Sequence, residues 1–164
     1  MENAQFHEAN RPGAIVQGAT RPASPCAVYS DEIQPGMSRT RYTTLSAADI
    51  ELFGRISGDM NPIHLDDAYA ATTMFGGRIA HGMLTAGLIS AVIGQDLPGN
   101  GTIYLKQDLE FLAPVRPGDT VEATVTVSEV SRERRRVTLD CACRVAGAVV
   151  LRGQALVLAP ARIG

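Results

Sequence analysis

The chain has little of several features that mark specialised classes of protein. It contains no tryptophan, only three cysteines and three histidines, and its formal net charge is −2. So small an excess of charge argues against a nucleic-acid scaffold and against a polybasic membrane binder. No apolar run approaches the ~18 residues that a membrane-spanning helix needs, and residues 1–27 lack the apolar core of a signal peptide. We therefore expect a cytoplasmic protein that binds neither nucleic acid nor membrane.

The scarce cysteines do not predict a disulfide framework. Three thiols cannot all pair, and Cys141 and Cys143 share one predicted strand, where their side chains point to the same face with poor bridging geometry. We interpret both as small core residues of a protein from a reducing compartment. Histidines and cysteines also lack the spacing typical of metal ligands, so no metal is expected.

Length and composition predict one globular domain behind an N-terminal tail. With 164 residues, 45% of them hydrophobic and 20% charged, the chain can bury a core without disulfides or a metal. Residues 1–28 contain Pro12, Pro22 and Pro25 and show no periodicity. We expect a flexible tail at 1–28 and a single domain over 29–164.

One apolar segment predicts a buried helix. Residues 82–95 carry apolar side chains on nearly every face of a helical wheel, which is typical of a helix inside a protein. Such a helix is ~21 Å long, so other elements must surround it. An earlier helix is expected to begin at Ser46, which forms a capping box with Asp49, and to end at Gly58. Residues 59–64 are expected to contain no regular helix, because Pro62 lacks a donor.

Alternating polar and apolar residues predict the sheet that surrounds this helix. A short strand is expected at 39–44, and half-buried antiparallel strands are expected at 103–111, 121–127, 137–145 and 148–158. The predicted fold class is α+β, with an antiparallel sheet curved around a buried helix. Such a sheet leaves open edges and an uncovered flank, which dimerisation through edge strands or helix faces would close.

A polar segment between residues 57 and 66 interrupts the apolar pattern. Asp59 and His64 lie on either side of Pro62, and a turn held rigid by that proline lets both face one cleft. A carboxylate and an imidazole in that arrangement can share one water molecule and exchange protons with it. Alone, the pattern fits equally a turn cap at Asp59 and a loop histidine at His64.

A second polar segment, residues 78–83, opens the buried helix. A helix N-terminus has unpaired N–H groups and a partial positive charge, so it can hold a developing oxyanion. Gly82 lets a ligand carbonyl approach the backbone there, whereas His81 could cap the helix or pack. Ser90 is a rare polar side chain of this helix, which could bond near the pair or back to its own helix.

Together these motifs resemble those of the MaoC-like (R)-specific enoyl-CoA hydratases. The likeness rests on residues 57–67, 80–84 and 104–119 and extends over roughly residues 40–130. Gly-Asp-x-Asn-Pro-x-His-x-Asp upstream of His-Gly-Met is specific for that family. The resemblance implies the hot-dog fold, an antiparallel sheet rolled around a central helix, which agrees with the pattern of the elements.

The resemblance also implies a role for each motif residue. Asp59 and His64 would activate the water that adds to C3 of a trans-2-enoyl thioester and would deliver a proton to C2, giving an (R)-3-hydroxyacyl-CoA. Asn61 would orient their loop, with a plain Asn-Pro turn as the alternative. The backbone N–H of Gly82 would stabilise the thioester oxyanion, and Ser90 would support the pair. CoA enters as part of the substrate, so no separate cofactor is expected.

Other readings of the same residues stay open. The substrate could be a branched, dicarboxylic or carrier-protein-bound enoyl thioester, or the chain could be a non-catalytic hot-dog module that binds acyl thioesters. The family suggests a homodimer in fatty acid metabolism, with polyhydroxyalkanoate synthesis as one setting. Arg39, Arg41, Arg78 and Lys106 are all candidates to bind the CoA phosphates.

Overall fold

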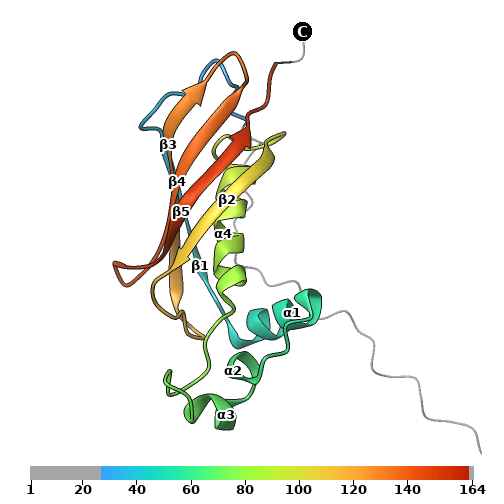
Figure 1. Ribbon diagram of the computed structural model, residues 1–164, viewed down its shortest axis with the longest axis vertical. Helices are drawn as coiled ribbons and strands as arrows, with labels where there is room; N and C mark the ends of the chain where they lie inside the picture. Colours follow the sequence, from blue (N-terminus) through green and yellow to red (C-terminus); the bar gives the residue numbers. More distant parts are fainter. Residues whose placement is uncertain (1–26, 163–164) are drawn as a thin grey trace, which may run out of the picture.

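A five-stranded antiparallel sheet and one long helix dominate the computed structural model, which describes residues 27–162 (Figure 1). The elements in chain order are β1 (Ser38–Thr44), α1 (Ala47–Ser57), α2 (Pro62–Leu65), α3 (Asp67–Ala71), α4 (Gly82–Gln95), β2 (Ile103–Phe111), β3 (Thr120–Ser131), β4 (Arg136–Val145) and β5 (Ala148–Leu158). The strand order is β1-β3-β4-β5-β2, and α4 lies along one face of the sheet. Helices α1 to α3 gather at the end of the sheet where α4 begins.

The predicted tail falls mostly outside the described residues. Residues 1–26 are not described, so the expectation of a flexible segment there stays a prediction. Ala27 forms an isolated bridge with Gly99, and the Val28 N–H donates to the Pro98 carbonyl at 2.8 Å. The chain is therefore hydrogen-bonded to the turn after α4 from residue 27 onward.

Local sequence signals placed α1 correctly. The Ser46 hydroxyl accepts from the Asp49 N–H at 3.2 Å, and the Asp49 carboxylate accepts from the Ser46 N–H at 2.8 Å. Gly58 ends α1 in the left-handed region, with φ of 80°. The expectation of no helix in residues 59–64 was wrong, because α2 begins at Pro62. Proline is well tolerated at the first helical position, where its missing N–H would have no partner in the helix.

Each predicted strand is present, and β3 is longer than expected. The register between β3 and β4 shifts between Val127 and Glu129, so an irregularity there absorbs one residue and pairing continues to Ser131. The turn between β4 and β5 has positive φ at Ala146 and Gly147, as a tight hairpin requires. Strand β2 departs from the prediction of a half-buried strand, because its apolar residues Ile103 and Leu105 are exposed at the edge of the sheet.

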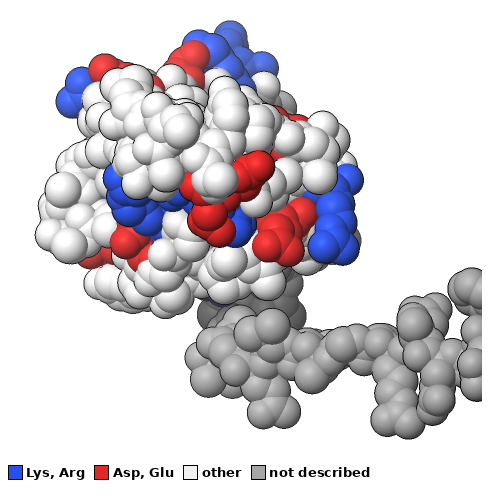
Figure 2. All heavy atoms as spheres, turned by 90° about the horizontal axis from the view of Figure 1, so that it is seen from below, with Lys and Arg blue, Asp and Glu red and all other residues white. Residues whose placement is uncertain are grey.

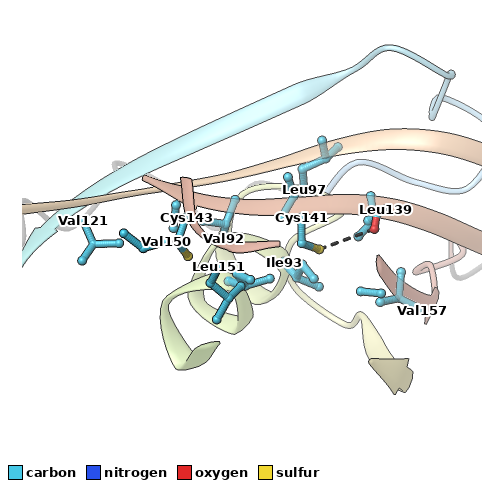
Figure 3. Packing of buried hydrophobic residues seen from close by; sticks show 14 of the residues in the cluster. Val92, Ile93, Leu97, Val121, Leu139, Cys141, Cys143, Val150, Leu151 and Val157 are labelled. Carbon is cyan, nitrogen blue, oxygen red and sulfur yellow. Dashed lines mark hydrogen bonds between the residues drawn. The ribbon is translucent and has the colours of Figure 1, made fainter. Parts of the chain in front are cut away.

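The core lies between α4 and the sheet. Thr85, Ile89, Val92 and Ile93 are the buried residues of α4. Figure 3 shows Val92 and Ile93 among side chains from the strands, and Leu97 just beyond the helix packs in the same cluster. The opposite flank of α4 is open, since Met83 is 59% exposed. A single sheet covers only one side of the helix, so the expected uncovered flank is confirmed.

Both cysteines of the described residues are core residues. Cys141 and Cys143 are buried and free. Burial raises the pKa of the Cys141 thiol to about 11 and that of the Cys143 thiol to about 12. The interpretation of the pair as small hydrophobic residues is thus confirmed. Among residues 27–162, the helices are all too short or too polar to cross a bilayer.

The close approach of β2 to β5 at Gly153 yields a stability prediction. A Cβ at Gly153 would lie 1.9 Å from the Asp108 carbonyl oxygen, which is backbone and cannot step aside. We expect Gly153→Ala to lower the free energy of unfolding by about 2 kcal/mol or more, as overpacking does. Urea unfolding measures this. Gly94→Ala is the control, since a Cβ at Gly94 meets no atom within 4 Å, and equal stability of the two variants would contradict the prediction.

Candidate active site

Asp59 lies in the short loop between α1 and α2, at the end of the molecule where α4 begins. Asp59 is exposed, and its carboxylate accepts a hydrogen bond from the Asn61 N–H at 3.3 Å. Its own N–H donates to the Ser57 hydroxyl at 3.2 Å, and its carbonyl accepts from His81 Nε2 at 2.9 Å. The main chain of Asp59 is therefore held on both sides.

Asn61 organises this loop in two ways. Its side-chain oxygen caps α2 by accepting from the Ile63 N–H at 3.2 Å, which is the Asn-Pro turn considered from the sequence. Its backbone N–H bonds to the Asp59 carboxylate. The side chain therefore forms the Asn-Pro turn, and a role of Asn61 in orienting the pair stays a prediction.

His64 is buried, and its hydrogen bond determines which nitrogen is free. Nδ1 lies 2.9 Å from the carbonyl oxygen of Ile79, and since a carbonyl can only accept, Nδ1 carries the proton. Nε2 of the neutral ring then has a free lone pair. Burial is the main cause that lowers the pKa of His64, and the neighbouring His81 lowers it further. The bond to Ile79 and the charge of Asp59 oppose this shift.

The segment before α4 runs alongside this loop. The Ile79 N–H donates to the Ile63 carbonyl at 3.3 Å, and Arg78 Nε donates to the His64 carbonyl at 2.8 Å. The guanidinium of Arg78 also lies 3.7 Å from the Glu51 carboxylate and is largely buried. Arg78 therefore braces the site from inside the protein.

The other candidate ligands of the CoA phosphates differ in how they are paired. Arg41 is paired with Asp96, and Lys106 with Asp108 at 2.8 Å. Arg39 donates to the Ser38 carbonyl at 2.8 Å. Figure 2, seen from the end that carries α1 to α3, shows acidic and basic side chains interspersed on a largely uncharged surface.

Helix α4 begins with free backbone donors. His81 occupies the N-cap position, yet its side chain makes no capping bond, so it does not cap the helix. Among the described residues the N–H of Gly82 has no hydrogen-bond acceptor, whereas those of Leu84 and Thr85 bond to the His81 carbonyl. A free N–H at a helix N-terminus is a ready donor to a developing negative charge.

A cavity of about 350 Å³ lies beside His64 and the start of α4. His64 and Gly82 both line it. Its other walls are mostly apolar and include Phe75, Ile79, Phe111, Leu112, Val150 and Leu151. The Phe111 ring stands over the start of α4, since a Cβ at Gly82 would lie 2.7 Å from it. A reacting polar group and an apolar tail could therefore occupy one continuous space.

Ser90 does not join this cavity within one chain. It is exposed on α4 and lies ~12 Å along the helix axis from Gly82, at 1.5 Å per residue. Its supporting role stays a prediction. Phe111, in contrast, was not singled out from the sequence, because an apolar residue at a strand end gives no sign that it will cover a helix terminus.

The donor atoms of Asp59, His64 and His81 lie within 4.8 Å of one another, close enough to consider a metal ion. The two imidazole rings, however, are stacked, with centroids 3.9 Å apart and planes inclined by 32°. Nitrogen lone pairs lie in the ring plane, so they do not converge at ~2 Å from a common point. The arrangement therefore does not suit a metal ion.

Comparison with known proteins agrees with the family resemblance of the motifs. Residues 30–145 match the family described as MaoC like domain. An (R)-specific enoyl-CoA hydratase of Rhodospirillum rubrum is 53% identical over 134 residues, which cover 82% of this chain and 93% of that protein. A 3-hydroxybutyryl-CoA dehydratase of Methylorubrum extorquens is 50% identical over 133 residues, which cover 81% of this chain and 85% of that protein.

A solved structure extends the likeness to the fold. The (R)-hydratase from A. caviae involved in PHA biosynthesis is similar with a TM-score of 0.76 at 41% identity, over 78% of this chain and 98% of that one. The hot-dog fold expected from the motifs is thereby confirmed.

The surroundings of His64 predict its titration. We expect its ring to titrate below the ordinary pKa of 6.5, because burial disfavours the charged form. Asp59→Asn should lower this pKa further, since it removes a negative charge that favours the imidazolium. Histidine ring signals in NMR, followed against pH and assigned with His64→Gln, measure both values. A pKa that rises in Asp59→Asn would contradict the prediction.

Proposed function

The chain belongs to the MaoC-like domain family, and from this premise we propose that it catalyses the reversible (R)-specific hydration of trans-2-enoyl-CoA to (R)-3-hydroxyacyl-CoA. One observation carries the proposal: His64, whose Nδ1 is bonded to a carbonyl, lines one largely apolar cavity together with Gly82, and the Asp59 carboxylate lies near His64. The relatives named as an (R)-specific hydratase and a 3-hydroxybutyryl-CoA dehydratase support it, because these names describe two directions of one reaction.

We assign the proton transfers to the pair of Asp59 and His64. A water molecule held between Asp59 and His64 loses a proton to the pair as its oxygen bonds to C3 of the enoyl group. Negative charge then develops on the thioester carbonyl oxygen, where the Gly82 N–H and the start of α4 stabilise it. The proton returns from the pair to C2 on the same face. The added hydrogen and hydroxyl both come from one water.

Nothing in this sequence of steps calls for a resident cofactor. The thioester already acidifies C2, and a positioned base suffices to activate the water. CoA belongs to the substrate, and the inclined ring planes of His64 and His81 do not direct their lone pairs to a common metal ion. We infer a lyase of the hydro-lyase type that works with its own side chains and main chain.

Cellular setting is inferred from the relatives. The 3-hydroxybutyryl-CoA dehydratase favours a short acyl chain, and the A. caviae structure, described as involved in PHA biosynthesis, favours a role in supplying hydroxyacyl-CoA for polyhydroxyalkanoate synthesis. We propose a cytoplasmic location, which the bacterial hydratase and dehydratase relatives support.

We also infer a homodimer joined at β2. This strand is an edge of the sheet, and Ile103, Leu105 and Phe111 are 55%, 46% and 53% exposed. Phe111 reaches the start of α4, so the apolar edge is continuous with the open flank of that helix. An exposed apolar edge strand next to an uncovered helix is an aggregation hazard unless another chain covers it. A second copy covers both at once.

Replacing either member of the pair tests the proposed reaction. Asp59→Asn and His64→Ala should each lower kcat by about 10²–10⁴, the usual contribution of general acid–base catalysis. The assay follows loss of the enoyl-thioester absorbance of crotonyl-CoA, and an (R)-specific dehydrogenase reads the chirality of the product. Asp31→Asn is the control, since Asp31 is an exposed carboxylate beside the hairpin of β3 and β4.

Two outcomes would count against the proposal. A near-normal kcat in either variant would contradict the assigned mechanism. A wild-type protein that is inactive toward crotonyl-CoA and toward longer, branched and carrier-bound enoyl thioesters would contradict the proposed activity itself.

The proposed dimer predicts a difference between the two edges of the sheet. Leu105→Lys places a charge on the β2 edge and should yield a folded monomer. Tyr42→Lys places the same charge on β1, the other edge, where Tyr42 is 68% exposed, and should leave the dimer intact. Sedimentation or light scattering gives the masses. A Leu105→Lys variant that stays dimeric while Tyr42→Lys dissociates would place the interface at β1.

A further inference from the structure

A histidine outside the proposed catalytic pair is buried at the centre of the site. His81 is 2% exposed, and its ring lies 3.9 Å from that of His64 and 5.0 Å from that of Phe53, measured between centroids. Its Nε2 lies 2.9 Å from the Asp59 carbonyl oxygen. The reaction steps above make no use of this residue.

The bond to Asp59 fixes the tautomer of His81. A carbonyl oxygen only accepts, so Nε2 carries the proton and donates it. Nδ1 is buried and has no hydrogen-bond partner among residues 27–162. Burying a ring nitrogen without a hydrogen-bond partner lowers the free energy of unfolding. The presence of such a ring indicates that its other contacts are needed for the site.

Those contacts link the two halves of the site. Asp59 follows the left-handed Gly58 that ends α1, so no helix holds its carbonyl. The bond from His81 holds it instead, and the next residue along the chain is Gly82, which supplies the free N–H. His81 therefore sets the distance between the acid of the pair and the oxyanion donor.

A glycine inside α1 supports this reading. A Cβ at Gly54 would lie 3.1 Å from the Asp59 carbonyl oxygen and 3.6 Å from Cε1 of His81. Glycine inside a helix costs about 1 kcal/mol relative to alanine. At this position its lack of a side chain gives the bond between His81 and Asp59 its room.

We propose that His81 is a positioning residue whose Nε2–H holds the Asp59 main chain in register with His64 and with the Gly82 N–H. The proposal rests on the hydratase function proposed above. It assigns to His81 no proton transfer and no contact with substrate.

Two substitutions separate the donor from the ring. His81→Gln keeps an amide N–H near the place of Nε2 and loses the aromatic ring, whereas His81→Phe keeps a ring and loses the donor. We expect His81→Phe to lower kcat about 100-fold, the effect of a misplacement near 1 Å, with KM little changed. His81→Gln should recover most of the lost kcat. Thermal unfolding of each variant measures stability separately.

A second readout does not depend on activity. Amide hydrogen exchange of residues 59–61 should be faster in His81→Phe than in the wild type and should stay slow in His81→Gln. Should the wild type prove inactive toward every enoyl thioester, the proposed function fails, and this exchange pattern still decides the role of His81.

Specific results would overturn the proposal. One is a His81→Phe variant with wild-type kcat and wild-type exchange at 59–61. Another is a His81→Gln variant as impaired as His81→Phe, which would make the ring and not the donor decisive. If neither variant folds, Gly54→Ala carries the test. It should gain helix stability yet lower kcat about 10-fold by displacing the Asp59 carbonyl, and an unchanged kcat would refute the role of the bond.

Discussion

The candidate site depends on hydrogen bonds between two segments that are distant in sequence. Residues 59–64 and 78–81 are joined side by side by the bonds of His64 to the Ile79 carbonyl, of Arg78 to the His64 carbonyl and of His81 to the Asp59 carbonyl. Each of these side chains donates to a backbone carbonyl of the other segment. Without them an exposed acid on a glycine-ended loop would have no fixed distance to the start of α4. The hydrogen bonds thus convert an irregular loop into a rigid part of the site.

Helix α4 connects this loop region to the stability of the whole domain. Its buried residues, such as Ile89 and Val92, pack on the sheet, while its first residues form the polar end of the cavity. The same helix therefore supplies core packing along its length and a free N–H at its start. Its open flank serves a third purpose in the proposed dimer. Movement of the Gly82 N–H relative to the sheet would require the core itself to be disturbed.

Features encoded by neighbouring residues could be predicted from the sequence. The capping box at Ser46, the limits of α4 and the hairpin after β4 depend on a few adjacent positions, and all are present. Helix α2 was missed because proline was treated as a helix breaker, although it is favourable at a first helical position. The exposure of β2 could not be seen, since alternation does not tell whether a neighbouring element covers the strand.

The site was predictable as a set of residues but not as an arrangement. Asp59, His64 and Gly82 were singled out by their types and by the family motif. In the structure His64 and Gly82 line one cavity, and the Asp59 carboxylate lies near His64. The bond from His81 to Asp59 depends on a tautomer and on a contact between distant segments, which no local pattern encodes. Ser90 was singled out as a polar residue of the same helix, but it lies two turns from the site and does not reach it within one chain.

The donor at Gly82 belongs to the main chain, and this has a consequence for how such a pocket can diversify. A main-chain N–H has no ionisable group, and every substitution except proline retains it. Changes of sequence therefore do not remove this hydrogen-bond donor. What drift can alter is the space around it, because the Phe111 ring occupies the volume that any side chain at position 82 would need. Positions 82 and 111 therefore form a steric pair. Evolution or design could reshape the cavity from the β2 side, while glycine at 82 leaves the main-chain N–H at its other end unchanged.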